Sequence, residues 1–125
     1  DDAAAYASER ICFGRPIVSF ELIQQKLADM EIALQNTRNM LYRTLWKMDT
    51  GQSVRIDSAL LKRYAAQQCT WVCSEALQIY GGLGFTTETR LGRLWLDCRG
   101  MQIAGGTDEI MVYIAGRQIA KEYAR

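Results

Sequence analysis

A repeat of apolar residues at every seventh position constrains the fold of this chain more than any other feature. The repeat comprises Phe20, Leu27, Leu34, Leu41 and Met48, with Ile23, Met30 and Leu45 filling the seam between them. This spacing is typical of a long amphipathic helix whose apolar stripe faces a neighbouring helix, as in a left-handed bundle. We therefore predict a helix from Phe20 to Met48. It should end near Asp49-Thr50-Gly51, where glycine can adopt a left-handed cap.

Three further helices follow from the same kind of pattern. We expect the first to begin between Ser53 and Asp57 and to run to Tyr80, stopped by Gly81-Gly82. Because it is apolar on two flanks, it should be wedged between neighbours. The remaining two are predicted over 88–102 and 108–123, the last with Thr107 as its N-cap. The first twelve residues also have helical composition. The sequence predicts an all-α protein, an up-and-down four-helix bundle with a short N-terminal helical stub.

Length and composition exclude several classes of function. The 125 residues accommodate one domain, so we treat 1–125 as a single unit. Fifteen Lys and Arg against fourteen Asp and Glu give a net charge of +1 with the signs interspersed, which argues against nucleic-acid binding. No apolar run approaches the roughly 20 residues of a membrane span. The absence of histidine removes His-based acid–base catalysis and most zinc sites.

The cysteines do not follow a metal or disulfide pattern. They are Cys12, Cys69, Cys73 and Cys98, and no two form a Cys-x-x-Cys pair. Cys69 and Cys73 should share one helix face, where a soft metal is conceivable. We interpret all four as small, buried, reduced thiols and predict no metal site.

Three stretches at helix boundaries stand out, over 10–17, 78–85 and 103–110. Each alone could serve only as a cap or a turn, and the glycines do not follow strands, so a Rossmann or P-loop site is excluded. Read together, they make the whole chain resemble the C-terminal helical domain of the flavin-dependent acyl-CoA dehydrogenases. The residues that carry the resemblance are Tyr6-Ala7, Glu9-Arg10, Phe13-Gly14, Pro16-Ile17, Phe20, Gln24, Leu27-Ala28-Asp29-Met30, Gln78-Ile79-Tyr80-Gly81-Gly82, Gly84-Phe85-Thr86, Glu88, Asp97, Arg99, Gly105-Gly106-Thr107 and Glu109-Ile110.

The resemblance implies that the domain binds FAD and takes part in the α,β-dehydrogenation of an acyl-CoA. It implies these cofactor contacts: Arg10 at the pyrophosphate, Phe13 beside the flavin, Gln78, Ile79, Tyr80, Gly81 and Gly82 at the adenine end of a partner subunit's FAD, and Thr107 and Glu109 bordering the flavin. Gly106 corresponds to a position near the acyl thioester. For Glu109, a solvated carboxylate that stabilises the helix dipole is an equally good interpretation. Glu21 stands where the family commonly has a glutamine, and an ionised carboxylate cannot donate the amide's hydrogen bond.

The catalytic base is expected outside this sequence. Many members of the family place a glutamate immediately before the Gly-Thr of the last motif, where this chain has Gly105. Long-chain and branched-chain members share a small residue there and carry the base upstream. The sequence opens in mid-pattern without a methionine, so we expect it to be cut from a longer protein. The base, an N-terminal α-domain and a middle β-domain would then precede Asp1, and the isolated chain should be inactive.

The resemblance also implies partners: an acyl-CoA substrate, an electron-transferring flavoprotein and a second copy of the chain in a homo-oligomer. A bacterial cytoplasm suits the composition best, and a mitochondrial matrix also suits it. Two other functions stay open at this stage. The chain could be a stand-alone helical assembly module derived from such an enzyme, or a domain of a related flavin oxidase or monooxygenase.

Overall fold

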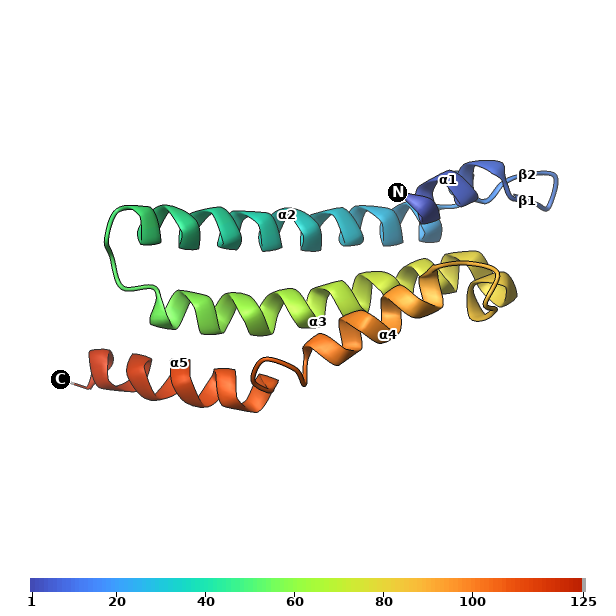
Figure 1. Ribbon diagram of the computed structural model, residues 1–125. Coiled ribbons are helices and arrows are strands. Elements are labelled where there is room, and N and C mark those ends of the chain that lie inside the picture. The colour runs from blue at the N-terminus through green and yellow to red at the C-terminus, as the bar shows by residue number, and fades with distance from the viewer. Residues whose placement is uncertain (125) are drawn as a thin grey trace.

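Residues 1–124 fold into four longer helices preceded by a short one, which confirms the predicted all-α class (Figure 1). The computed structural model describes residues 1–124. Its elements are α1 (Asp2–Glu9), β1 (Ile11–Cys12), β2 (Arg15–Pro16), the 3-10 turn η1 (Ile17–Ser19), α2 (Glu21–Asp49), α3 (Arg55–Tyr80), the 3-10 turn η2 (Gly81–Phe85), α4 (Leu91–Met101) and α5 (Asp108–Tyr123). None of the helices in the described part is long and apolar enough to cross a membrane.

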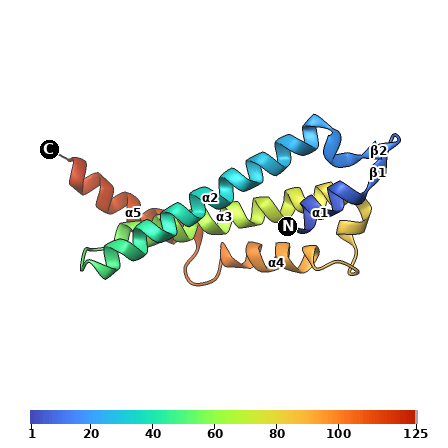
Figure 2. The same cartoon turned by 90° about the horizontal axis from the view of Figure 1, so that it is seen from above.

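Helix α3 is the centre of the packing. It runs antiparallel to α2 on one side, while α4 and α5 follow one another along its other side (Figures 1 and 2). Helix α1 packs against the C-terminal part of α3. The prediction that this helix is wedged between neighbours is therefore confirmed, and most of its residues from 61 to 70 are half-buried.

Three of the six buried residues of the core at the α1 end are alanines. Ala3 and Ala7 of α1 and Ala76 of α3 are buried together with Ile79, which is 5% exposed. Met30 of α2 and Leu91 of α4 complete this cluster. Alanines let the backbones of α1 and α3 approach closely, and the larger side chains of Met30, Ile79 and Leu91 pack with them in the same cluster.

The predicted apolar stripe of α2 faces α3 over only part of its length. Leu27 and Leu34 are half-buried, but Leu41 and Met48 are 40% and 56% exposed. A straight helix drifts by about 20° per heptad from a strict sevenfold repeat, so a stripe aligned at Leu27 has turned off α3 by Met48. Thr44 takes the buried position instead, with its Oγ1 donating to the carbonyl of Met40 at 2.8 Å.

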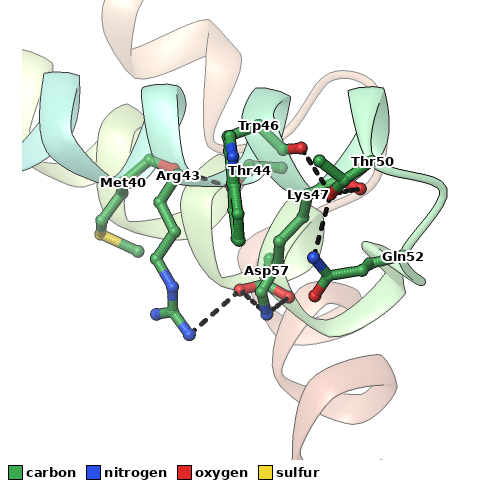
Figure 3. A network of polar contacts seen from close by, with 8 residues as sticks. All are labelled: Met40, Arg43, Thr44, Trp46, Lys47, Thr50, Gln52 and Asp57. Carbon is green, nitrogen blue, oxygen red and sulfur yellow. Dashed lines mark hydrogen bonds and ion pairs between the residues drawn. The ribbon is translucent and has the colours of Figure 1, made fainter.

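The turn between α2 and α3 is held by an ion-pair network (Figure 3). The Lys47 Nζ lies 3.0 and 2.8 Å from the two carboxylate oxygens of Asp57, and an Arg43 nitrogen lies 3.8 Å from the same group. Helix α2 ends at Asp49 and Gly51 has φ 72°, so the predicted glycine turn is confirmed. Asp57 in the first turn of α3 also complements the positive end of the helix dipole.

The N-terminal segment departs from the prediction. Helix α1 ends at Glu9, and Ile11–Cys12 pairs antiparallel with Arg15–Pro16 in a short hairpin. Phe13 and Gly14 form its tip with φ values of 52° and 77°. Pro16, which cannot continue a helix interior, and Gly14, which readily takes a positive φ, are the residues that outweigh the helical composition here.

The helix predicted over 88–102 is shorter in the structure. It begins at Leu91, after a loop in which the Thr86 hydroxyl donates to the carbonyl of Leu83 at 2.8 Å. The Thr86 Oγ1 also accepts from the backbone N–H of Glu88. These hydrogen bonds between a hydroxyl and nearby backbone groups compete with helix formation, which explains the later start.

Candidate functional site

Two segments far apart in the sequence meet around a cleft of about 390 Å³ beside the end of α3. Arg10, the residue after α1, lies on this cleft with Ile79, Tyr80, Gly81 and Gly82; Tyr6, Ile17 and Leu83 complete its lining. The structure therefore brings together five of the residues that the sequence analysis assigns to cofactor binding.

Aromatic stacking fixes α1 at this cleft. The rings of Tyr6 and Tyr80 stack with their centroids 4.1 Å apart. The Tyr80 hydroxyl donates to the carbonyl of Asp2 at 3.2 Å, and burial is the main cause that raises the pKa of Tyr80. Next to the stack, the Arg10 carbonyl accepts from the N–H of Ile17 at 2.9 Å. The backbone that carries the Arg10 side chain is thus held on both sides.

The glycines of this segment have two different roles. Gly81 ends α3 with φ 61°, a conformation that favours glycine, and a Cβ at Gly81 or Gly82 would meet nothing within 4 Å. At Gly84, by contrast, a Cβ would lie 2.8 Å from the carbonyl oxygen of Leu77. Gly84 is therefore required for packing, whereas Gly81 and Gly82 leave their backbone open to a ligand.

Three further residues predicted to contact FAD lie outside the cleft, in the β1–β2 hairpin, at the start of α2 and near the end of α3, which share one end of the molecule (Figure 1). Phe13 is at the hairpin tip and 93% exposed, with its ring edge-on to Phe20 at 6.3 Å. Glu21 is the exposed first residue of α2, and Gln78 is exposed near the end of α3. The chain itself leaves all three side chains accessible to a ligand or a neighbouring domain.

A second cluster lies at the turn between α4 and α5. Gly105 and Gly106 have φ 64° and 100°, and the Lys62 ammonium of α3 donates to the Gly106 carbonyl. The Gln67 amide donates to Asp108 Oδ2 at 2.9 Å. The side chain of Thr107 accepts from the N–H of Ile110 at 3.4 Å, which confirms Thr107 as the N-cap of α5. Two polar residues of α3 therefore hold the turn.

Glu109 is solvent-exposed in this turn. Hydrogen bonds from its own backbone N–H and from the Thr107 hydroxyl hold the pKa of Glu109 below its usual value. Arg99 and Arg63 add smaller electrostatic contributions in the same direction. This environment suits a carboxylate that stabilises the start of α5, and its exposure also leaves it open to a ligand.

The two clusters are separated along α3. Gln67 contacts the second cluster and Ile79 lines the first, and at 1.5 Å per residue these positions are ~18 Å apart along the helix axis. Sequence reasoning missed Lys62 and Gln67. Both are polar residues on a helix that the sequence predicts to be wedged between neighbours. This could have pointed to them, because half-buried polar groups need hydrogen-bond partners.

Three of the cysteines gather between α3 and α4. Cys73 Sγ lies 3.8 Å from Cys98 Sγ, and Cys69 and Cys98 line an apolar cleft of about 360 Å³. Burial raises the pKa of Cys73 to about 12, so this thiol is protonated at neutral pH. The prediction of four buried thiols is wrong for Cys12, which is exposed on the hairpin, and the other three are half-buried. Within residues 1–124, no three His, Cys, Asp or Glu side chains are grouped to hold a metal ion.

Comparison with known proteins shows the family to which the chain belongs. The profile of the family "Acyl-CoA dehydrogenase, C-terminal domain" matches residues 1–120. The probable acyl-CoA dehydrogenase YdiO of Escherichia coli is 51% identical over 123 residues, which cover 98% of this chain and 32% of the relative. The chain thus spans about a third of the length of that relative.

Solved structures share the fold. Butyryl-CoA dehydrogenase from Megasphaera elsdenii matches with a TM-score of 0.92 and 35% identity over 94% of this chain and 31% of its own. An FAD complex of PigA matches with a TM-score of 0.90 and 31% identity over 96% of this chain and 31% of its own. The chain belongs to the family of acyl-CoA dehydrogenase C-terminal domains.

Proposed function

We propose that the protein containing this chain is an FAD-dependent acyl-CoA dehydrogenase that removes two hydrogens from the α and β carbons of an acyl-CoA. The observation that carries this proposal is the cleft in which Arg10 meets Gly81 and Gly82, in a chain of this family. The butyryl-CoA dehydrogenase among the similar structures and the FAD complex of PigA support the choice of substrate class and cofactor.

The chemistry of the cleft fits the phosphate-bearing part of FAD. A guanidinium presents a planar fork of donors that matches phosphate oxygens, and Arg10 is exposed at the cleft. The open space at Gly81 and Gly82 allows a ligand to approach the backbone closely. We assign Arg10 and residues 78–82 to the pyrophosphate and adenine end, with Glu21 beside them.

The residues of the second cluster are assigned to the reactive end. Thr107 and Glu109 would border the flavin, and Gly106 would lie near the thioester. The exposed ring of Phe13 is at the end of the molecule that holds the first cluster, and it would lie beside a flavin there. When bound, FAD supplies the hydride acceptor, and the chain's own groups bind and orient it.

The catalytic base is provided from outside residues 1–125. Gly105 has no carboxylate, and the Asp108 carboxylate already accepts from Gln67 and faces Lys62 at 4.0 Å. Glu109 is engaged with Thr107 and the start of α5. Abstraction of a proton needs a carboxylate free to reach the α-carbon, so none of these groups serves as the base.

Oligomerisation is part of this proposal. Large apolar side chains remain exposed on the chain, among them Trp46 at 59% and Met48 at 56% on α2. Exposed apolar groups of this size mark surfaces that other protein segments cover. We propose that a second copy and the remaining domains cover them, and that an electron-transferring flavoprotein re-oxidises the enzyme. The free thiols and the bacterial relatives favour the bacterial cytoplasm.

Purification of the complete native protein tests the proposal. We expect a yellow protein with bound FAD that oxidises an acyl-CoA when an artificial electron acceptor is present. Arg10→Met should lower the affinity for FAD at least tenfold, while the matched change Arg38→Met on the exposed face of α2 should not. A complete protein that neither binds FAD nor oxidises any acyl-CoA would refute the assignment.

The same preparation separates the two alternative functions. A native product of 14.2 kDa that self-associates without FAD would establish a stand-alone assembly module, which the exposed apolar side chains favour as the second candidate. An enzyme that uses molecular oxygen as fast as the artificial acceptor would instead be a flavin oxidase or monooxygenase.

A further inference from the structure

Lys62 is the residue of α3 that reaches the glycine turn between α4 and α5. Its ammonium donates to the backbone carbonyl of Gly106 and lies 4.0 Å from Asp108 Oδ1. The Lys62 side chain is 25% exposed and that of Asp108 is 13% exposed, so water screens these contacts only in part. A charged donor at a half-buried carbonyl is a strong and directional contact.

This contact sets the orientation of one peptide plane. The Gly106 carbonyl and the Thr107 N–H belong to the same planar trans peptide, so they point in opposite directions. Because Lys62 holds the carbonyl toward α3, the Thr107 N–H points away from α3. None of the hydrogen bonds within residues 1–124 uses that N–H as a donor.

The other backbone hydrogen bonds of the turn fix the next peptide plane, between Thr107 and Asp108. Asp108 N–H donates to the carbonyl of Gln102 at 3.0 Å, and Met111 N–H donates to the carbonyl of Thr107 at 3.0 Å. Both glycines have positive φ, so the turn has the conformational freedom to adopt other orientations. A fixed orientation therefore requires an external anchor, and Lys62 occupies that place.

We propose that Lys62 is a positioning residue that directs the free Thr107 N–H toward an acceptor oxygen of FAD or of the acyl thioester. This inference rests on the proposed function. Hydrogen bonding at the Gly106 carbonyl also polarises the peptide, which strengthens the N–H on its other side as a donor. Lys62 touches neither ligand itself and acts through the backbone of the turn.

The variants that test this proposal are Lys62→Met, Lys62→Arg and the control Lys26→Met. Methionine keeps the length of the side chain and removes the donor, whereas arginine keeps a cationic donor. Lys26 is a matched control because it also forms a partly exposed interhelical contact, an ion pair with Glu75, but it lies far from the turn. All variants are made in the complete protein.

The first measurement is hydrogen exchange of the backbone amides of Asp108 and Met111, which needs neither cofactor nor substrate. We expect Lys62→Met to accelerate their exchange at least tenfold, with Lys62→Arg restoring most of the protection and Lys26→Met causing no change at these amides. Unchanged exchange in Lys62→Met would overturn the proposal.

The second measurement separates the two possible acceptor oxygens. A tenfold or larger rise in the dissociation constant of FAD in Lys62→Met assigns the acceptor to the cofactor. A tenfold or larger fall in kcat at unchanged FAD affinity assigns it to the thioester. Recovery in Lys62→Arg is expected in either case. Wild-type affinity and wild-type kcat in Lys62→Met would overturn the positioning role.

Failure of the proposed function gives a different result. In that case the wild-type protein neither binds FAD nor oxidises an acyl-CoA, while the exchange measurement still decides whether Lys62 holds the turn. A loss of kcat that Lys26→Met reproduces to the same extent would show that helix packing in general is responsible, and this also overturns the proposal.

Discussion

The side chains of Asp2 and Arg90 form a bidentate ion pair, with Arg90 Nε to Asp2 Oδ2 and Arg90 Nη2 to Asp2 Oδ1 both at 2.7 Å. The pair joins the start of α1 to the residue that precedes α4. The hydrogen bonds from Arg90 are the main cause that lowers the pKa of Asp2 below its usual value. Because the folded-state pKa is depressed, the pair stabilises the fold above the ordinary pKa of aspartate and loses this effect as pH falls through the lowered value.

The first prediction concerns the pH dependence of stability. We expect the wild-type urea midpoint to fall as pH drops below about 4, where Asp2 becomes protonated in the unfolded chain and then in the folded one. Asp2→Asn should remove this part of the dependence, whereas Asp97→Asn on the exposed face of α4 should keep it. Parallel curves for wild type and Asp2→Asn would contradict the prediction.

The second prediction ranks the two cations at Asp57. Lys47→Met should lower the free energy of unfolding by about 1–2 kcal/mol, because it leaves a half-buried carboxylate without its nearest donor. Arg43→Met should cost less than about 0.5 kcal/mol, since the Arg43 side chain is 69% exposed and 3.8 Å away. Chemical denaturation checks the order, and equal costs would show that the network in Figure 3 does not discriminate between them.

The third prediction distinguishes two glycines. Gly84→Ala should destabilise the protein by about 1–3 kcal/mol, because the new methyl group would lie 2.8 Å from Leu77 O and 2.9 Å from Tyr80 Cβ. Gly116→Ala should stabilise it by about 0.5–1 kcal/mol, because Gly116 is exposed within α5 and its Cβ would meet nothing. Thermal melts of both variants provide the comparison, and a stable Gly84→Ala variant would disprove the close packing of η2 on α3.

The fourth prediction tests the core at the α1 end. Ile79→Ala should reduce the free energy of unfolding by about 2–5 kcal/mol, because Ile79 is 5% exposed and its removal leaves a cavity. Ile32→Ala makes the same chemical change at a position that is 57% exposed, so we expect an effect within about 0.5 kcal/mol. Equal losses would indicate that α1 and α3 do not form a common core there.

The helices and their ends were largely predictable because their causes are local. Apolar periodicity predicted α2 and α3, Gly51 and Gly81 predicted where they stop, and Thr107 predicted the start of α5. The hairpin tip at Phe13 was missed, since a left-handed φ at a phenylalanine has no clear sequence signal. The later start of α4 was missed because the Thr86 hydroxyl competes for backbone groups.

Packing partners were less predictable than helices. A sevenfold repeat shows that a stripe exists, but the drift of a straight helix decides which part of the stripe reaches α3, so the exposure of Leu41 and Met48 could not be foreseen. For the site, the motifs assigned Arg10, Gly81 and Gly82 to cofactor binding separately, without predicting that these residues line one cleft. They did not indicate Lys62, because its contact with Gly106 joins residues 44 positions apart through tertiary structure.

The central position of α3 also determines the order in which this chain can assemble. Helices α2 and α3 are neighbours in sequence and closing the short loop between them loses little chain entropy, so their hairpin can form first. Helices α4 and α5 then have a surface on which to dock, one after the other. The contact between Asp2 and Arg90, whose positions differ by 88, has the largest sequence separation of these, so we expect it to form last. Because α1 lines the cleft beside Arg10, we expect this cleft to be completed only when α1 docks, late in folding.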